Sequence, residues 1–140
     1  MKKYNFFLTI TIVFFISSAE AELSNFEKGK NFFNEKKYNL AQFKFEQDIV
    51  FNPKNENSYL YLAKIYNFKK NDNLEEKNLN TVILLNPKNE EAIFKLALLK
   101  IRKSNYEETE KLIKNFKNVC NKMCQQVSDL QKKLEAVLKK

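Results

Sequence analysis

The sequence has no histidine and no tryptophan, and only one glycine, two prolines and two cysteines among 140 residues. Without histidine, the chain lacks the usual general base near neutral pH and the commonest metal ligand. The shortage of glycine and proline argues against a sheet protein with tight hairpins, whose turns need those residues. No glycine-rich phosphate loop and no nucleophile elbow is present either. We therefore expect a helical protein that is not an enzyme and uses no cofactor or metal ion.

Arginine is also scarce, because Arg102 is the only one beside a large number of lysines. The formal net charge of +8 would suit an anionic partner such as nucleic acid, lipid headgroups or an acidic protein. Proteins that read nucleic acid usually rely on the arginine fork for phosphates and base edges. We interpret the charge as a solvated, lysine-rich surface and expect no nucleic-acid partner. A dedicated anion site is the alternative interpretation.

The amino terminus has the pattern of an export signal. Two lysines follow the first methionine, an apolar run covers residues 6–16, and a small-x-small triplet (Ala-Glu-Ala) ends at Ala21. This order is typical of a secretory signal peptide. The apolar run is about 11 residues long, whereas a membrane-spanning helix needs about 20. We expect residues 1–21 to be removed after Ala21 and the rest to be exported to a bacterial periplasm without membrane insertion. A retained anchor is the alternative.

A five-residue string recurs unchanged at a fixed distance along the chain. It occupies residues 52–56 (NPKNE) and again residues 86–90, which gives an offset of 34. The same offset aligns small residues at Gly29, Ala63 and Ala97, and apolar residues at Phe45, Leu79 and Ile113 and at Phe51, Leu85 and Val119. Repeats of this period are stacked helical units, each too small to bury its own apolar face.

Within each period the pattern predicts two helices. In the middle period, Tyr59, Leu62 and Tyr66 are spaced for one helix face, and a second apolar face begins at Leu79 after a polar turn. Pro87 ends that second helix because its ring cannot continue it. Small residues at 29, 63 and 97 allow the two helices of a hairpin to approach closely.

These residues resemble the tetratricopeptide repeat family over about residues 23–119. The resemblance rests on the period, the small residues at Gly29, Ala63, Ala97 and Ala41, and the two prolines that close second helices. It also rests on the aromatics Phe32, Tyr38, Tyr59 and Tyr66. It implies an all-α solenoid of about three helix hairpins, at about 22–55, 56–89 and 90–119. The sequence departs from the family's small residues at Asp48, Glu75 and Thr109, and Lys100 replaces an aromatic. A plain helical bundle is the alternative.

The carboxyl-terminal segment is expected to cap the stack. Residues 120–127 are predicted to form a turn, and the capping box that begins at Ser128 starts a helix over 128–140 with one apolar stripe. Repeat arrays need such a helix over their open end. A free amphipathic helix that binds membranes is the alternative.

Cys120 and Cys124 are the only cysteines and lie in this predicted turn. Exported chains usually pair their cysteines, so we expect a local disulfide that fixes the capping helix. A redox-active pair is the alternative, although such pairs are more typically spaced C-x-x-C and lie beside a βαβ unit. A metal site would need about four ligands, which the chain cannot complete.

The resemblance also implies a binding surface, because in this family the first helices of successive units line a concave groove. The corresponding residues are mostly apolar with a few basic ones: Phe26, Lys30, Phe33, Leu60, Lys64, Phe68, Phe94, Leu98, Ile101 and Arg102. The implied ligand is a peptide or helix of another protein, apolar with some acidic character. The charged clamp that some members use for a terminal carboxylate is not expected, because Phe26 stands at its first position. The alternative is that several of these residues pack against each other or the last helix.

We therefore predict an adaptor of the bacterial envelope that binds another protein in this groove. A self-associating structural module that forms a homo-oligomer is the second hypothesis, and a thiol–disulfide helper is the third.

Overall fold

The computed structural model describes residues 22–139, and this part of the chain contains helices and no strand. The helices are α1 (Asn25–Asn34), α2 (Tyr38–Phe51), α3 (Glu56–Phe68), α4 (Asp72–Leu85), α5 (Glu90–Arg102), α6 (Tyr106–Val119) and α7 (Gln125–Leu138). None of these helices is long and apolar enough to cross a membrane. The expected export signal and its cleavage site at Ala21 lie outside the described residues.

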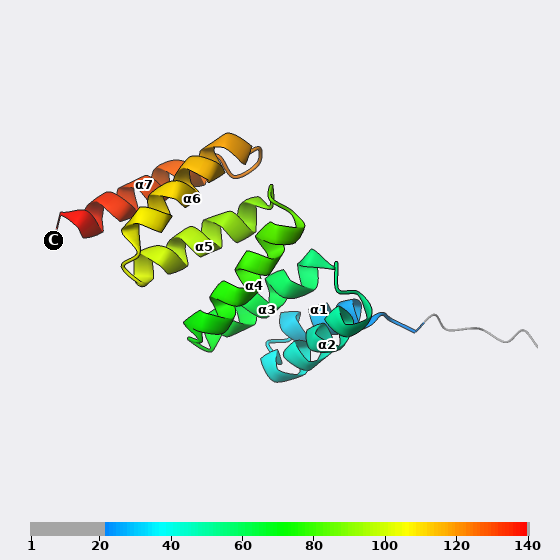
Figure 1. Ribbon diagram of the computed structural model, residues 1–140. Helices are drawn as coiled ribbons and strands as arrows, with labels where there is room; N and C mark the ends of the chain where they lie inside the picture. Colours follow the sequence, from blue (N-terminus) through cyan, green and yellow to red (C-terminus); the bar gives the residue numbers. More distant parts are fainter. Residues whose placement is uncertain (1–21, 140) are drawn as a thin grey trace, which may run out of the picture.

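The first six helices form three hairpins, α1 with α2, α3 with α4 and α5 with α6. The hairpins stack in chain order, so that α1 and α2 lie at one end and α7 at the other (Figure 1). Helix α7 packs on both α5 and α6. The predicted all-α solenoid of three hairpins with a final capping helix is confirmed.

Asparagine side chains begin four of the helices. The side chains of Asn55, Asn71, Asn89 and Asn105 accept hydrogen bonds from backbone N–H groups in the first turns of α3, α4, α5 and α6. Each bond satisfies a donor that the helix itself leaves unpaired. The asparagine-rich turns of the sequence therefore fix where the helices start.

The first helix of every hairpin ends in the same left-handed turn. Lys36, Lys70 and Ser104 have φ angles of 59°, 54° and 57°, and these positions are again 34 residues apart. The two backbone bonds of a Schellman turn close each corner. At Lys70 they run from its own N–H to the Asn67 carbonyl and from the Asn71 N–H to the Tyr66 carbonyl. The left-handed turn therefore repeats every 34 residues, although the residue types at these positions do not indicate it.

The predicted small column lies where the helices of each hairpin touch. A Cβ atom on Gly29 would lie 2.7 Å from a ring carbon of Phe45, so the side chain must be absent there. Ala63 and Ala97 hold the equivalent positions and are buried. The apolar column of Phe45, Leu79 and Ile113 is buried beside it.

The polar residues that depart from the family pattern are buried and have partners. The Asp48 carboxylate accepts hydrogen bonds from the side chains of Ser58, Asn55 and Asn52, and so holds the turn between α2 and α3. Glu75 accepts from Asn67 and Arg102. The Thr109 hydroxyl donates to the backbone carbonyl of Asn105, the residue that caps the start of α6.

Helix α7 begins at Gln125, three residues before the start that the sequence suggested, so the predicted capping box at Ser128 is wrong. The Ser128 hydroxyl lies inside the helix and donates to the Gln125 carbonyl. The preceding turn is held by the Glu90 carboxylate, which accepts from the N–H groups of Lys122 and Met123. The N–H of Met123 holds the pKa of Glu90 below its ordinary value. These bonds reverse the chain early and leave Ser128 to continue a helix.

Candidate partner-binding surface

Four aromatic side chains meet where the first two hairpins adjoin. Phe26 and Phe33 come from α1, and Tyr61 and Phe68 come from α3. The Tyr61 ring centroid lies 5.9 Å from that of Phe26 and 5.0 Å from that of Phe33. Phe33 and Phe68 are 6.3 Å apart. We call these four residues the aromatic patch.

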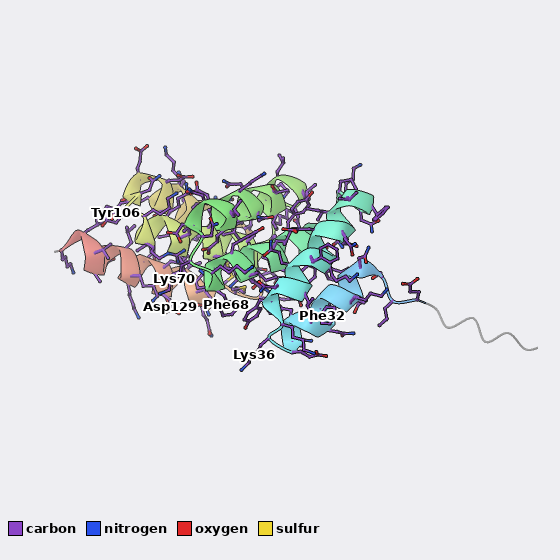
Figure 2. The ribbon with its side chains drawn as sticks, turned by 90° about the horizontal axis from the view of Figure 1, so that it is seen from below. Phe32, Lys36, Phe68, Lys70, Tyr106 and Asp129 are labelled. Carbon is purple, nitrogen blue, oxygen red and sulfur yellow. A yellow bond between two sulfur atoms is a disulfide. The ribbon has the colours of Figure 1, made fainter. Side chains whose placement is uncertain are left out.

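Helix α2 supports the patch from behind. Tyr61 stacks on the buried Phe45 ring at 4.9 Å, and Phe68 stacks on Tyr38 at 4.7 Å. Phe68 nevertheless remains 58% exposed. It lies at the end of α3, next to the corner at Lys70 (Figure 2). The patch is therefore a preformed apolar surface. The protein would lose little conformational freedom when a ligand binds there.

Two lysines border the patch. The ammonium of Lys30 lies 5.5 Å from the centroid of Phe26, and that of Lys64 lies 4.8 Å from the centroid of Tyr61. Lys64 also pairs with Glu91 of α5 at 2.9 Å, and Lys30 pairs with Glu27 at 3.1 Å. Cation–π contacts of this kind hold both ammonium groups over the faces of the rings, so positive charge lies directly beside the aromatic patch.

A basic hollow of about 400 Å³ adjoins the patch at Tyr38, and its lining is Lys36, Lys37, Tyr38, Asn39, Leu40 and Lys69. Lys69 donates hydrogen bonds to the side chains of Asn39 and Gln42 across the hollow. Positive charge therefore lies on the same side of the molecule as the exposed Phe68 ring.

Half of the predicted groove residues lie at the patch: Phe26, Lys30, Phe33, Lys64 and Phe68. Leu60 does not, because it is only 6% exposed and packs in the core with Ala63 and Leu79. Arg102 points toward α4 instead, where its guanidinium binds Asp72 at 2.9 Å and Glu75 at 2.7 Å.

Phe94, Leu98 and Ile101, the other predicted groove residues, pack in one cluster with the buried side chains of α7. Phe94 also lies 6.2 Å from the buried Phe116 ring. In the third hairpin the last helix thus covers much of the apolar surface that the sequence assigned to a partner. This was the alternative that the sequence left open.

Comparison with known proteins identifies the fold. No protein-family model matches the chain, and no curated protein matches it. The first TPR of Spaghetti (RPAP3), bound to the HSP90 peptide SRMEEVD, is 20% identical with a TM-score of 0.72, over 81% of this chain and 90% of that one. The TPR2B domain of yeast Sti1, in complex with pHsp70, is 14% identical with a TM-score of 0.72, over 80% and 94%. The Yersinia enterocolitica type III secretion translocator chaperone SycD is 16% identical with a TM-score of 0.74, over 83% and 84%. The chain has the tetratricopeptide repeat fold.

The register of the repeats explains why the sequence missed Tyr61. Phe26 and Phe33 are seven residues apart on α1, and Tyr61 and Phe68 are seven apart on α3. The two pairs are offset by 35 residues, whereas the tetratricopeptide repeat has a period of 34. A strict period therefore selects Leu60, which lies in the core. The seven-residue aromatic spacing was the signal that could have selected Tyr61.

The two cysteines lie outside the aromatic patch. Cys120 and Cys124 are joined by a disulfide in the turn between α6 and α7, with their Cα atoms 5.2 Å apart. Within residues 22–139 no group of three or more His, Cys, Asp or Glu side chains is placed to hold a metal ion. The chemistry that this tetratricopeptide repeat surface offers is apolar contact bordered by positive charge.

Proposed function

We propose that this protein is a non-enzymatic adaptor of the bacterial envelope that binds a segment of another protein at the aromatic patch. The observation that carries the proposal is the patch itself. Its rings are held by core contacts, yet Phe68 is 58% exposed and lysines border it. An apolar surface of this kind, rimmed by polar groups, marks an interaction site.

The ligand that suits this surface has apolar or aromatic side chains and acidic neighbours. Apolar groups would cover Phe33 and Phe68, and carboxylates would face Lys30, Lys64 and the basic hollow. Solved structures with the same fold include one bound to an HSP90 peptide and one in a pHsp70 complex. They support a peptide ligand here by analogy of fold.

The envelope location is proposed from the export-signal pattern of residues 1–21. The disulfide between Cys120 and Cys124 supports it, because such bonds persist in oxidising compartments such as the periplasm.

The proposal can be tested by site-specific photo-crosslinking in the producing cells. A benzoylphenylalanine replaces Phe68 in one variant and Phe43 in another. Phe43 is a matched control because it is 54% exposed on α2 and lies outside the patch. We expect one envelope protein to crosslink through position 68 and not through position 43.

The crosslinked segment is then synthesised and titrated against purified protein. Phe68→Ser should weaken its binding about tenfold or more, since burying one aromatic ring is worth roughly 2 kcal/mol. Phe43→Ser should leave binding unchanged. Equal binding by all three proteins would refute the patch as the site.

Self-association is a second candidate, because α2 carries exposed apolar side chains that do not belong to the aromatic patch. Leu40, Phe43 and Val50 are 49%, 54% and 74% exposed. If these side chains join two copies, the sedimentation coefficient will rise with protein concentration, and Phe43→Ser will abolish the rise. A monomer at all concentrations excludes this candidate.

A further inference from the structure

Helix α7 stands where the first helix of a fourth hairpin would stand. Helices α3, α5 and α7 begin at Glu56, Glu90 and Gln125, so the successive offsets are 34 and 35. Its buried residues Val127, Leu130 and Leu134 continue, at an offset of 34, the columns of Ile93, Leu96 and Lys100. Figure 1 shows α7 beside both helices of the third hairpin. Within the described residues, no second helix follows to complete the pair.

The surface that a second helix would cover is an open groove between α6 and α7. In the complete hairpins that helix packs on Gly29, Ala63 or Ala97. The residue of α7 at the corresponding position, 34 residues after Ala97, is Gln131, and its side chain is exposed. Gln131 lines a groove of about 310 Å³ whose other lining residues are Leu134 of α7 and Glu110, Ile113, Lys114 and Lys117 of α6.

The second hairpin shows how such a groove is normally filled. The comparable space between α2 and α3 is closed by α4, and only a cavity of about 200 Å³ remains there. Glu46 and Ile49 of α2 and Leu74 of α4 line that cavity. A single helix is therefore the shape that the α6–α7 groove accommodates.

The charges of the groove indicate what that helix carries. Its floor is apolar, because Ile113 and Leu134 are the residues at its base and each is only 6% exposed. Its rim is basic, because Lys114 and Lys117 are exposed and neither belongs to an ion pair formed within residues 22–139. Glu110 is the only acidic residue among the lining residues.

We propose that the α6–α7 groove binds one amphipathic helix of a partner protein, which completes a fourth hairpin. The helix runs antiparallel to α7, as second helices do, and its apolar stripe covers Ile113 and Leu134. Its acidic residues face Lys114 and Lys117. The site is distinct from the aromatic patch, which lies on α1 and α3.

The test uses designed peptides and nuclear magnetic resonance. The probe is a capped peptide of about 18 residues, long enough to form a helix, with leucine and alanine at helical spacing and glutamate on its flanks. A second peptide has lysine in place of glutamate. We expect the acidic peptide to shift the backbone amide signals of α6 and α7, and not those of α1 and α3. The basic peptide should cause no such shifts.

Two charge-reversed variants show whether the rim lysines act locally. Lys114→Glu with Lys117→Glu should weaken binding of the acidic peptide about tenfold, since each pair contributes up to about 1 kcal/mol. Lys132→Glu with Lys133→Glu changes the net charge by the same amount on exposed residues that do not line the groove. This control should bind like the wild type.

Three results would overturn the proposal. Equal loss in both variants would show non-specific charge attraction. Shifts confined to the aromatic patch would place the helix at the other site. A protein that forms a dimer, and becomes a monomer on reversal of Lys114 and Lys117, would assign the groove to a second copy of the chain.

Discussion

At the scale of single residues, the corners between paired helices carry a conformational cost. Lys36, Lys70 and Ser104 adopt left-handed angles, which cost a residue with a side chain roughly 1 kcal/mol. Glycine adopts them freely. Lys70→Gly should therefore raise the free energy of unfolding by about 0.5–1 kcal/mol, after allowance for the greater freedom of glycine in the unfolded chain.

Urea denaturation measures this change. Lys77→Gly is the matched control, because Lys77 is an exposed lysine within α4. Glycine there should lower the free energy of unfolding by about 1 kcal/mol. If both variants are destabilised, the corner at Lys70 is not strained.

Asp48 is the second residue whose role the structure defines. It is 2% exposed and accepts hydrogen bonds from Ser58 at 2.6 Å and Asn55 at 2.7 Å. Asp48→Ala leaves these donors unpaired, so it should lower the free energy of unfolding by about 2–3 kcal/mol. The exposed Asp129→Ala should change it by less than about 0.5 kcal/mol. Because alanine restores the small residue that the family pattern suggests, an unchanged stability would show that the hydrogen bonds contribute nothing.

The sequence marked Asp48, Glu75 and Lys100 as departures from the repeat and could not explain them. Their partners come from other helices: Ser58 for Asp48, Arg102 for Glu75. A one-dimensional period predicts which positions are buried. It does not predict which distant polar groups converge on them, because that depends on how the helices turn against each other.

At the scale of helices, Lys100 joins α5 to both of its neighbours. Its ammonium lies 2.6 Å from carboxylate oxygens of Glu76 on α4 and of Glu108 on α6. Burial alone would lower the pKa of Lys100, but the hydrogen bonds to Glu108 and Glu76 outweigh it, and the pKa is raised. Hydrogen bonds from Lys100 and Lys103 lower the pKa of Glu76.

A lowered pKa at Glu76 makes this junction sensitive to acid. The stabilisation is present above the unfolded value of 4.5 and is lost as the pH falls through the lower folded value. The wild type should exceed Glu76→Gln in free energy of unfolding by about 1 kcal/mol near neutral pH. The difference should shrink as the pH falls below 4.5 and vanish once the pH is below the lowered folded value. Urea denaturation of both proteins across this range checks it, and a constant difference would contradict the assigned pKa direction.

The existence of each helix could be predicted from periodicity, whereas the start of α7 and the extent of the candidate groove could not. The apparent capping box at Ser128 has the right residue types, but Glu90 and the disulfide reverse the chain earlier. The buried residues Val127, Leu130 and Leu134 then cover the third hairpin. Phe94 accordingly packs in the cluster that α7 forms with the third hairpin, although its sequence position matches that of Phe26. The covering of the third hairpin by α7 depends on contacts between distant segments, which a local sequence pattern does not predict.

At the scale of the whole molecule, the stack is a chain of neighbour contacts. Three buried clusters follow one another, around Phe45 in the first hairpin, around Leu79 in the second and around Phe116 in the third with α7. Each hairpin packs only on the next, as in other repeat arrays, whose stability is a sum of local terms. The aromatic patch and the α6–α7 groove belong to different clusters. A ligand at one surface should therefore affect the other only through the middle hairpin.

The neighbour-to-neighbour packing predicts which helices a local substitution destabilises. Replacing both cysteines, Cys120→Ser with Cys124→Ser, removes the closure of a short loop and should cost about 2 kcal/mol in the loop-entropy description. Because α7 contacts α5 and α6, amide hydrogen exchange should accelerate in those three helices and stay unchanged in α1 to α3.

Asp48→Ala is the matching control at the other end of the stack. In this variant exchange should accelerate in α2 and α3 and stay unchanged in α6 and α7. Uniform acceleration throughout in either variant would mean that the stack unfolds as one cooperative unit. The two binding surfaces would then be coupled through global stability, and independent occupation of the patch and the groove could no longer be expected.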